Sequence, residues 1–266
     1  MNAKTLNESP IHYYVGGNEE GECLMFLHAA FADHSMFDRQ VAYFNDKYKI
    51  ITLDLIGHGQ SLKTKKGDSI EKMADWMLQI IEKEQIKKVH LIGISLGSII
   101  IQDFANKFPE KVASLACFGG YDINNFDPDM QKGNSKGQVV MMLKAMLSIK
   151  WFAKSNKKIS AFTERAQEEF YQMNIHFPKK SFMYLASLNR MVNKCKSQKR
   201  EYGLLIGCGE HDIPMELEAV DIWHKSEPES KKVVFKGAGH CVNMDVPEEF
   251  NEVMKEFFCY KSLDIR

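Results

Sequence analysis

The stretch VHLIGISLGSIIIQDF, residues 89–104, raises the question of why a serine stands between two glycines. An uncharged apolar run enters Gly93-Ile94-Ser95-Leu96-Gly97, and an apolar segment with helical character follows it. A G-x-S-x-G between a strand and a helix reverses the chain sharply, so that the serine Oγ projects above the sheet. Small flanking residues avoid collisions at this turn. The stretch therefore predicts a nucleophilic Ser95.

Short apolar runs alternate with longer helical patterns along most of the sequence, which predicts an α/β fold. Most of these runs are continuous, as expected for strands that are buried on both faces of a parallel sheet. We expect a doubly wound, mostly parallel sheet that binds ligands at the carboxyl ends of its strands. The expected strands are residues 23–27, 50–55, 89–94, 112–118, 202–208 and 232–235.

The alternation stops between residues 121 and 200. The pattern there predicts helices over residues 138–152, 159–173 and 181–194, with no convincing strand. We expect residues 121–200 to form a helical subdomain, inserted into a core made of residues 1–120 and 201–266. The segment is rich in methionine and aromatic residues. We expect a few of them to line a cleft, because methionine adapts to ligands that vary.

Composition restricts the partners that we expect. The 266-residue chain has 35 basic and 35 acidic residues, so it has no overall field to attract nucleic acid or an anionic membrane. No apolar run is long enough for membrane insertion, and the N-terminus lacks the apolar core of a secretory signal, which predicts a cytoplasmic protein. The six cysteines show no CxxC spacing. We expect no metal and no cofactor, and a homodimer is left open.

A nucleophilic serine requires a base, and the base requires an orienting acid. His240 follows the last expected strand and precedes the terminal helix, so it should lie at the same sheet edge as Ser95. Glu210 and Asp212 follow the strand expected at residues 202–208. Asp212 is the preferred acid because it directly precedes the turn toward the next helix. Asp122, which follows an earlier strand, is a lesser candidate.

The chain order Ser95, Asp212, His240 resembles that of the α/β-hydrolase family, in its serine hydrolase branch with a helical cap. The resemblance covers essentially the whole chain. It includes LDLIGHGQS, which is similar to the D-x-x-G-x-G-x-S turn of the family and implies a structural turn in which His58 is not catalytic. The matching residues of this turn are Asp54, Gly57, Gly59 and Ser61.

The resemblance also implies an oxyanion hole. One donor would be the backbone N–H of Leu96, and the other would come from the loop FLHAAFADHSMF, where His28 occupies the histidine place and Ala30 is the matching donor. Ala29 replaces the usual glycine. Because alanine resists positive φ, we expect an ordinary backbone conformation at this position. Phe31 is the alternative donor.

The function that the resemblance implies is that of a carboxylesterase-like hydrolase without a cofactor. It would cleave a small-molecule ester, thioester or lactone through a Ser-His-Asp triad and an acyl-enzyme. A serine nucleophile disfavours the dehalogenase and epoxide hydrolase branches, which carry aspartate at that place. Two alternatives are open at this point. One is hydrolysis of a carbon–carbon bond in a β-diketone, and the other is a ligand sensor whose triad turns over slowly.

Overall fold

The computed structural model describes residues 1–127, 135–193 and 200–262 of the chain. An eight-stranded sheet with the order β1-β2-β4-β3-β5-β6-β7-β8 runs through its centre. Strands β3 to β8 pair in parallel, whereas β2 pairs antiparallel with both β1 and β4. The fold is therefore the predicted α/β class with a mostly parallel sheet. The strands are β1 (Asn2–Thr5), β2 (His12–Gly17), β3 (Cys23–Leu27), β4 (Lys49–Leu53), β5 (Val89–Ile94), β6 (Val112–Phe118), β7 (Gly203–Gly209) and β8 (Lys231–Phe235).

The antiparallel edge formed by β1 and β2 was not predicted. All residues of β3 and β5 are buried, and such continuous apolar runs are easily recognised. In β1 no residue is fully buried, and β2 alternates between buried and partly exposed positions. The sequences NAKT and HYYVGG therefore lack the uniform apolar character that identifies a central strand.

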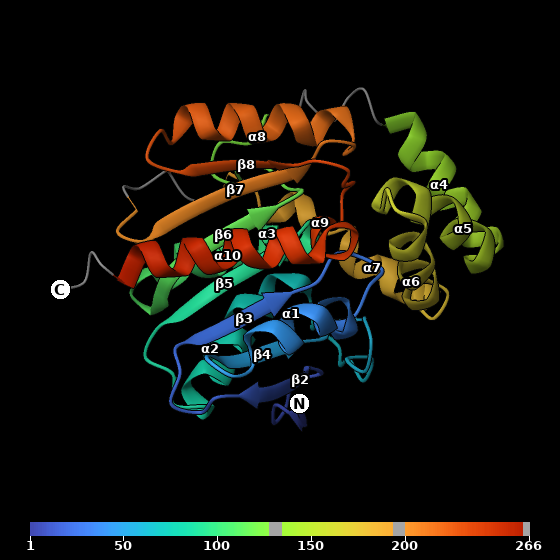
Figure 1. The fold of residues 1–266 in the computed structure, drawn as a ribbon. Coiled ribbons are helices and arrows are strands. Elements are labelled where there is room, and N and C mark those ends of the chain that lie inside the picture. Colours follow the sequence, from blue (N-terminus) through green and yellow to red (C-terminus); the bar gives the residue numbers. More distant parts are fainter. Residues whose placement is uncertain (128–134, 194–199, 263–266) are drawn as a thin grey trace.

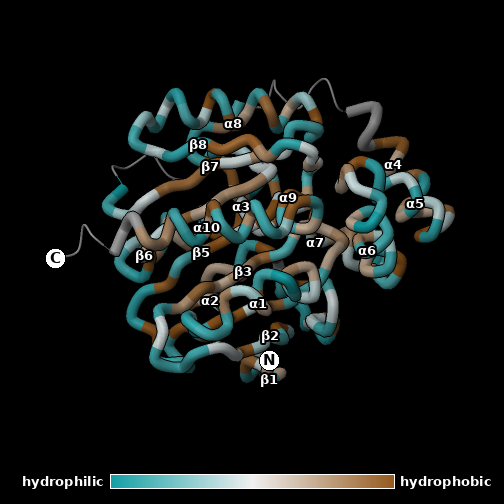
Figure 2. Tube along the Cα trace, in the orientation of Figure 1, coloured by the Kyte–Doolittle hydropathy of each residue, from teal (hydrophilic) through white to brown (hydrophobic). Residues whose placement is uncertain are grey.

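Helices cover both faces of the sheet (Figure 1). Side chains of α2, α3 and α8 belong to the apolar core on one face, and those of α1 and α10 to the core on the other. Figure 2 shows the matching pattern, with hydrophobic central strands and alternating hydropathy along α8 and α10. None of the described helices is long and apolar enough to cross a membrane. The helices outside residues 121–200 are α1 (Asp38–Phe44), α2 (Met73–Lys83), α3 (Leu96–Lys107), α8 (Pro214–Ser226), α9 (Val242–Asp245) and α10 (Pro247–Ser262), with short 3₁₀ turns at His34–Phe37, Ile70–Lys72 and Pro109–Lys111.

Residues 121–200, named here the inserted segment, lie between β6 and β7 in the chain, and the helices described within them lie beside the carboxyl ends of the strands (Figure 1). The segment is helical as predicted, but its helices are shorter. The expected helix over 138–152 is broken at Ser148, whose side chain caps the next helix by accepting the Trp151 N–H. The last expected helix is reduced to short turns, and its final residue, Lys194, lies outside the described residues. The helices are α4 (Ser135–Leu147), α5 (Ile149–Ser160), α6 (Glu164–Asn174) and α7 (Phe182–Leu185), with 3₁₀ turns at Lys179–Ser181 and Leu188–Arg190.

Candidate active site

Ser95 occupies a strained turn between β5 and α3. Its φ of 53° and ψ of −112° lie in a region that favours glycine and costs a residue with a side chain about 1–3 kcal/mol. The Ser95 N–H donates to the Phe118 carbonyl at 2.7 Å, which ties the turn to the end of β6. A Cβ on Gly97 would lie 2.1 Å from the Leu27 carbonyl oxygen, so this position requires glycine. The backbone thus has the geometry of a nucleophile elbow.

Asp212 and His240 come together at the same edge of the sheet. They follow β7 and β8, and His240 Nδ1 donates to Asp212 Oδ1 at 2.9 Å. The Asp212 side chain is fully buried. His240 packs against Gly119, because a Cβ on this glycine would lie 2.9 Å from two atoms of the ring. His240 and Ser95 therefore both border residues 118–120, although no hydrogen bond joins their side chains in the described structure. Such bonds are often long before substrate binds.

The two other acid candidates are directed elsewhere. Asp122 Oδ1 accepts the Asn124 N–H at 2.9 Å, within its own loop. Glu210 is exposed, and its Oε2 accepts the Gly237 N–H at 3.2 Å. Of the three carboxylates considered from the sequence, Asp212 is the one that the structure brings to His240.

A second buried carboxyl group, Glu216, interacts electrostatically with both Asp212 and His240. It belongs to the first turn of α8 and is only 6% exposed. Its Oε2 and Asp212 Oδ2 are buried without a hydrogen-bond partner among the described residues. Burial raises the pKa of Glu216 to about 7, with His240 opposing this shift and the charge of Asp212 adding to it. The sequence analysis missed Glu216, because a glutamate in the first turn of a helix is common and gives no sign of burial.

These charges determine the protonation of His240. Burial alone would lower the pKa of its imidazole, but the charge and hydrogen bond of Asp212, with a contribution from Glu216, outweigh burial and raise the pKa to about 9. The environment therefore favours the imidazolium, the form that a histidine base takes after it has accepted a proton from a serine.

The loop after β3 contains the proposed oxyanion donors. His28 fixes this loop, because its Nε2 accepts the Leu55 N–H at 3.0 Å and its Nδ1 donates to the Ala29 carbonyl at 2.7 Å. Ala29 has an ordinary backbone conformation, as predicted, and the positive φ falls on Phe31 at 69°. Within the described residues, the N–H groups of Ala30, Phe31 and Leu96 have no acceptor. Ala30 and Phe31 are therefore both candidates for the second donor.

The Phe31 side chain connects this loop to the inserted segment. The centroid of its ring lies 4.8 Å from that of Phe152 in α5 and 5.4 Å from that of Phe182 in α7. It also lies 5.0 Å from that of Phe177, which precedes α7. These contacts place part of the inserted segment directly above the loop of the candidate oxyanion hole.

Asp245 joins the inserted segment to the loop that contains His240. Its carboxylate accepts the N–H groups of Phe162 and Thr163 and the Thr163 hydroxyl, all from the inserted segment, at 2.7–3.1 Å. It also accepts the Gly239 N–H at 2.8 Å, next to His240. Asp245 was not predicted from the sequence, since its partners are distant in the chain.

The LDLIGHGQS motif forms a turn around Asp54. Gly57 and Gly59 have φ values of 77° and 48°, and a Cβ on Gly59 would lie 2.3 Å from Asp54 Cγ. The Ser61 hydroxyl donates to the Asp54 carbonyl at 2.7 Å. His58 is fully buried, with Nδ1 at 3.0 Å from a main-chain carbonyl oxygen. These contacts support the structural role implied for this motif.

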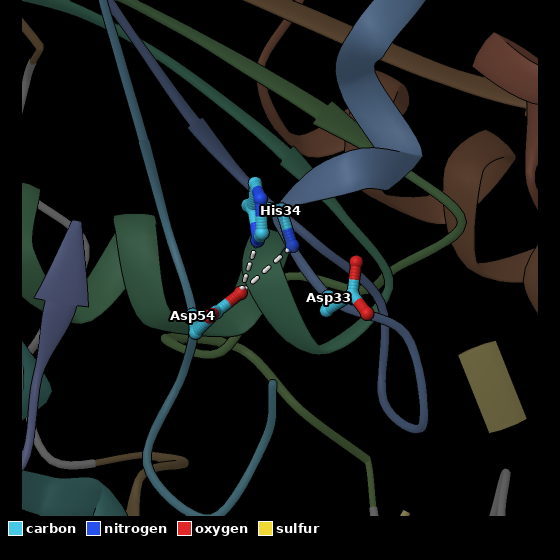
Figure 3. A group of neighbouring side chains, drawn as sticks. All are labelled: Asp33, His34 and Asp54. Carbon is cyan, nitrogen blue, oxygen red and sulfur yellow. Dashed lines mark hydrogen bonds and ion pairs between the residues drawn. The ribbon is translucent and has the colours of Figure 1, made fainter. Parts of the chain in front are cut away.

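Asp54 also belongs to a cluster with Asp33 and His34 (Figure 3), whose potential metal-binding atoms lie within 4.8 Å of one another. Asp54 Oδ1 accepts both the backbone N–H and the Nδ1–H of His34, and Oδ2 accepts the Gln60 N–H and the Tyr14 hydroxyl. Burial would raise the pKa of Asp54, but the bonds from His34 and Gln60 outweigh it and lower the pKa to about 2. Each oxygen of the Asp54 carboxylate thus accepts two hydrogen bonds, and these bonds stabilise the turn.

The arrangement of strands, elbow and loops agrees with comparisons to known proteins. Residues 22–139 match the model of the alpha/beta hydrolase fold family. An esterase from Exiguobacterium antarcticum has a similar structure, with a TM-score of 0.81, 21% sequence identity and coverage of 93% of this chain and 96% of that chain. The chain has the α/β-hydrolase fold.

Two curated enzymes from Acinetobacter baylyi are similar in sequence to this chain. One is (E)-2-((N-methylformamido)methylene)succinate hydrolase, 25% identical over 96% of this chain and 97% of that protein. The other is 3-oxoadipate enol-lactonase 2, 30% identical over 40% of each chain. The fold together with these relatives identifies the chain as a hydrolase.

Proposed function

We propose that the protein hydrolyses a small carboxylic ester, thioester or lactone, with Ser95 as nucleophile, His240 as base and Asp212 as the orienting acid. The observation that carries this proposal is the Asp212–His240 hydrogen bond at the sheet edge where Ser95 stands in its strained turn. The likeness to an esterase and an enol-lactonase supports ester or lactone hydrolysis in general.

In the proposed reaction, Ser95 Oγ attacks the acyl carbon while its proton passes to His240 Nε2. Asp212 stabilises the imidazolium, and the N–H groups of Leu96 and of Ala30 or Phe31 hold the oxyanion. His240 then gives the proton to the leaving alcohol, thiol or lactone oxygen. Water attacks the acyl-enzyme by the same route and releases the acid. The inserted segment would act as a cap over the acyl group.

The substrate class can be tested with a panel of acyl and aryl esters, thioesters, lactones and β-diketones. We expect sustained multiple turnover of at least one ester or lactone, in the usual range of ~1–10³ s⁻¹, and inactivation by a serine-directed sulfonyl fluoride. Turnover of β-diketones alone would instead assign carbon–carbon bond hydrolysis. Thermal stabilisation by a ligand, with reaction ending after one turnover on every compound, would assign a sensor.

The pH dependence of hydrolysis tests whether the charge of Glu216 helps to raise the pKa of His240. Because the pKa of His240 is raised to about 9, we expect kcat/KM to rise with pH through the alkaline range as the imidazole loses its proton. Glu216 is ionised there, since its own pKa is about 7. Glu216→Gln removes one negative charge near the imidazolium and should move this rising limb to lower pH.

The matched control is Glu218→Gln, which removes an exposed carboxylate from the same helix. This control variant should leave the rising part of the pH profile of kcat/KM at the same pH as in the parent protein. A Glu216→Gln profile that coincides with that of the control would contradict an electrostatic role for Glu216, and a fall in activity at all pH values would indicate structural damage instead.

A further inference from the structure

The inserted segment has a strong positive charge, although the whole chain is neutral. Residues 121–200 contain fifteen lysine and arginine residues and six aspartate and glutamate residues. This excess of nine positive charges is balanced by an equal negative excess in the rest of the chain. Figure 1 shows that α4, α5 and α6 project at one end of the molecule, and these three helices contain seven basic and three acidic residues.

The same end exposes large apolar side chains. On α4, Val139, Leu143 and Leu147 repeat every four residues and are 54–73% exposed, and Met146 beside them is 66% exposed. Trp151, at the start of α5, is 50% exposed. In Figure 2, α4 appears mainly hydrophobic at the edge of the molecule. A helix face of this kind is unusual in contact with water and indicates an interaction surface.

Lysines surround this apolar face. Lys150, Lys154 and Lys158 are exposed and repeat every four residues along α5. The Lys179 ammonium donates to the Met146 carbonyl at 2.7 Å, which places the turn at Lys179–Ser181 against the end of α4. Lys144 Nζ lies 5.6 Å from the centroid of the Trp151 ring. Exposed basic and apolar groups are therefore interspersed on α4, α5 and the turn at Lys179–Ser181, which together we name the α4–α5 surface.

We propose that the α4–α5 surface docks the protein on an anionic lipid bilayer. Apolar side chains flanked by lysines suit the boundary of a bilayer, where the apolar groups enter the acyl layer and the ammonium groups contact anionic headgroups. A symmetric contact with a second copy would bring two positively charged segments together, which electrostatic repulsion opposes. Nucleic acid would match the lysines but not the aliphatic residues of α4.

The proposal is tested by sedimentation of the purified full chain with two kinds of vesicle, phosphatidylcholine alone and phosphatidylcholine mixed with phosphatidylglycerol. We expect binding to the anionic vesicles that weakens as salt is added, because salt screens the headgroup charge. Replacing Lys150, Lys154 and Lys158 together with glutamate should reduce binding at least ~10-fold. Trp151→Ser combined with Leu147→Ser should reduce it as well.

The control replaces Lys47, Lys87 and Lys88 with glutamate. These exposed lysines precede β4 and β5, at the opposite edge of the sheet, and give the same change in net charge. This variant should bind like the parent protein, and all variants should keep their thermal stability. Equal loss in both lysine variants, equal binding to both vesicles or no binding would overturn the proposal. So would self-association that the α4–α5 substitutions abolish, which would assign the surface to a second copy.

Discussion

Ser95→Ala is expected to lower ester turnover at least ~10³-fold, because the members of a catalytic triad act as a unit and the nucleophile has no substitute. Folding should be retained, since the Ser95 N–H that bonds to Phe118 is unaffected. The measurement is kcat on the best ester of the panel, together with the thermal unfolding midpoint. Hydrolysis at the parental rate would exclude Ser95 as the nucleophile.

Ser95→Gly provides a companion variant that separates chemistry from strain. It also lacks the hydroxyl, so it should be as inactive as Ser95→Ala. Glycine adopts a φ of 53° without steric cost, whereas alanine retains the strain of the elbow. We therefore expect the glycine variant to be the more stable of the two. A stability order with alanine above glycine would show that the elbow is not strained.

Asp212→Asn is expected to lower kcat by roughly 10⁴ while the fold is kept, because an amide no longer holds the imidazole in the correct tautomer. It should also lower the pKa of His240, since the charge of Asp212 helps to raise that pKa. Both effects can be read from the pH dependence of kcat/KM. Asp122→Asn is the matched control and should change kcat little, because Asp122 bonds within its own loop. A larger loss in the Asp122 variant would reassign the acid.

The sequence was most informative where local chemistry determines local structure. The run VHLIGI predicts β5 because buried strands of a parallel sheet are continuously apolar. The two glycines of the motif match close approaches at the elbow, Gly97 to Leu27 and Gly93 to the backbone at the start of α3. The loops after β7 and β8 were located because parallel strands bring their carboxyl ends to one edge, where the structure places Asp212 against His240.

The sequence was least informative in two respects. It did not show bonds and burial that depend on how the helices end and pack, and it did not show that two regions of opposite charge cancel in the total. Ser148 divides the single helix expected over residues 138–152 into two, because its side chain caps the second one, and this capping bond is not visible in the sequence. The burial of Glu216 depends on how α8 packs against the end of β7. The equal numbers of acidic and basic residues suggested a chain without an electrostatic field, but that balance is a sum over two regions of opposite charge.

The contacts of Asp245 determine how the inserted segment can move. The carboxylate binds the junction of α5 and α6 to the loop of His240, so opening at that point would break several hydrogen bonds at once. We therefore expect Asp245 to act as a pivot, with larger displacements in α4, which is separated from this junction by α5. Substrate would then enter and product would leave on the α4 side, next to the surface that faces the bilayer in our proposal.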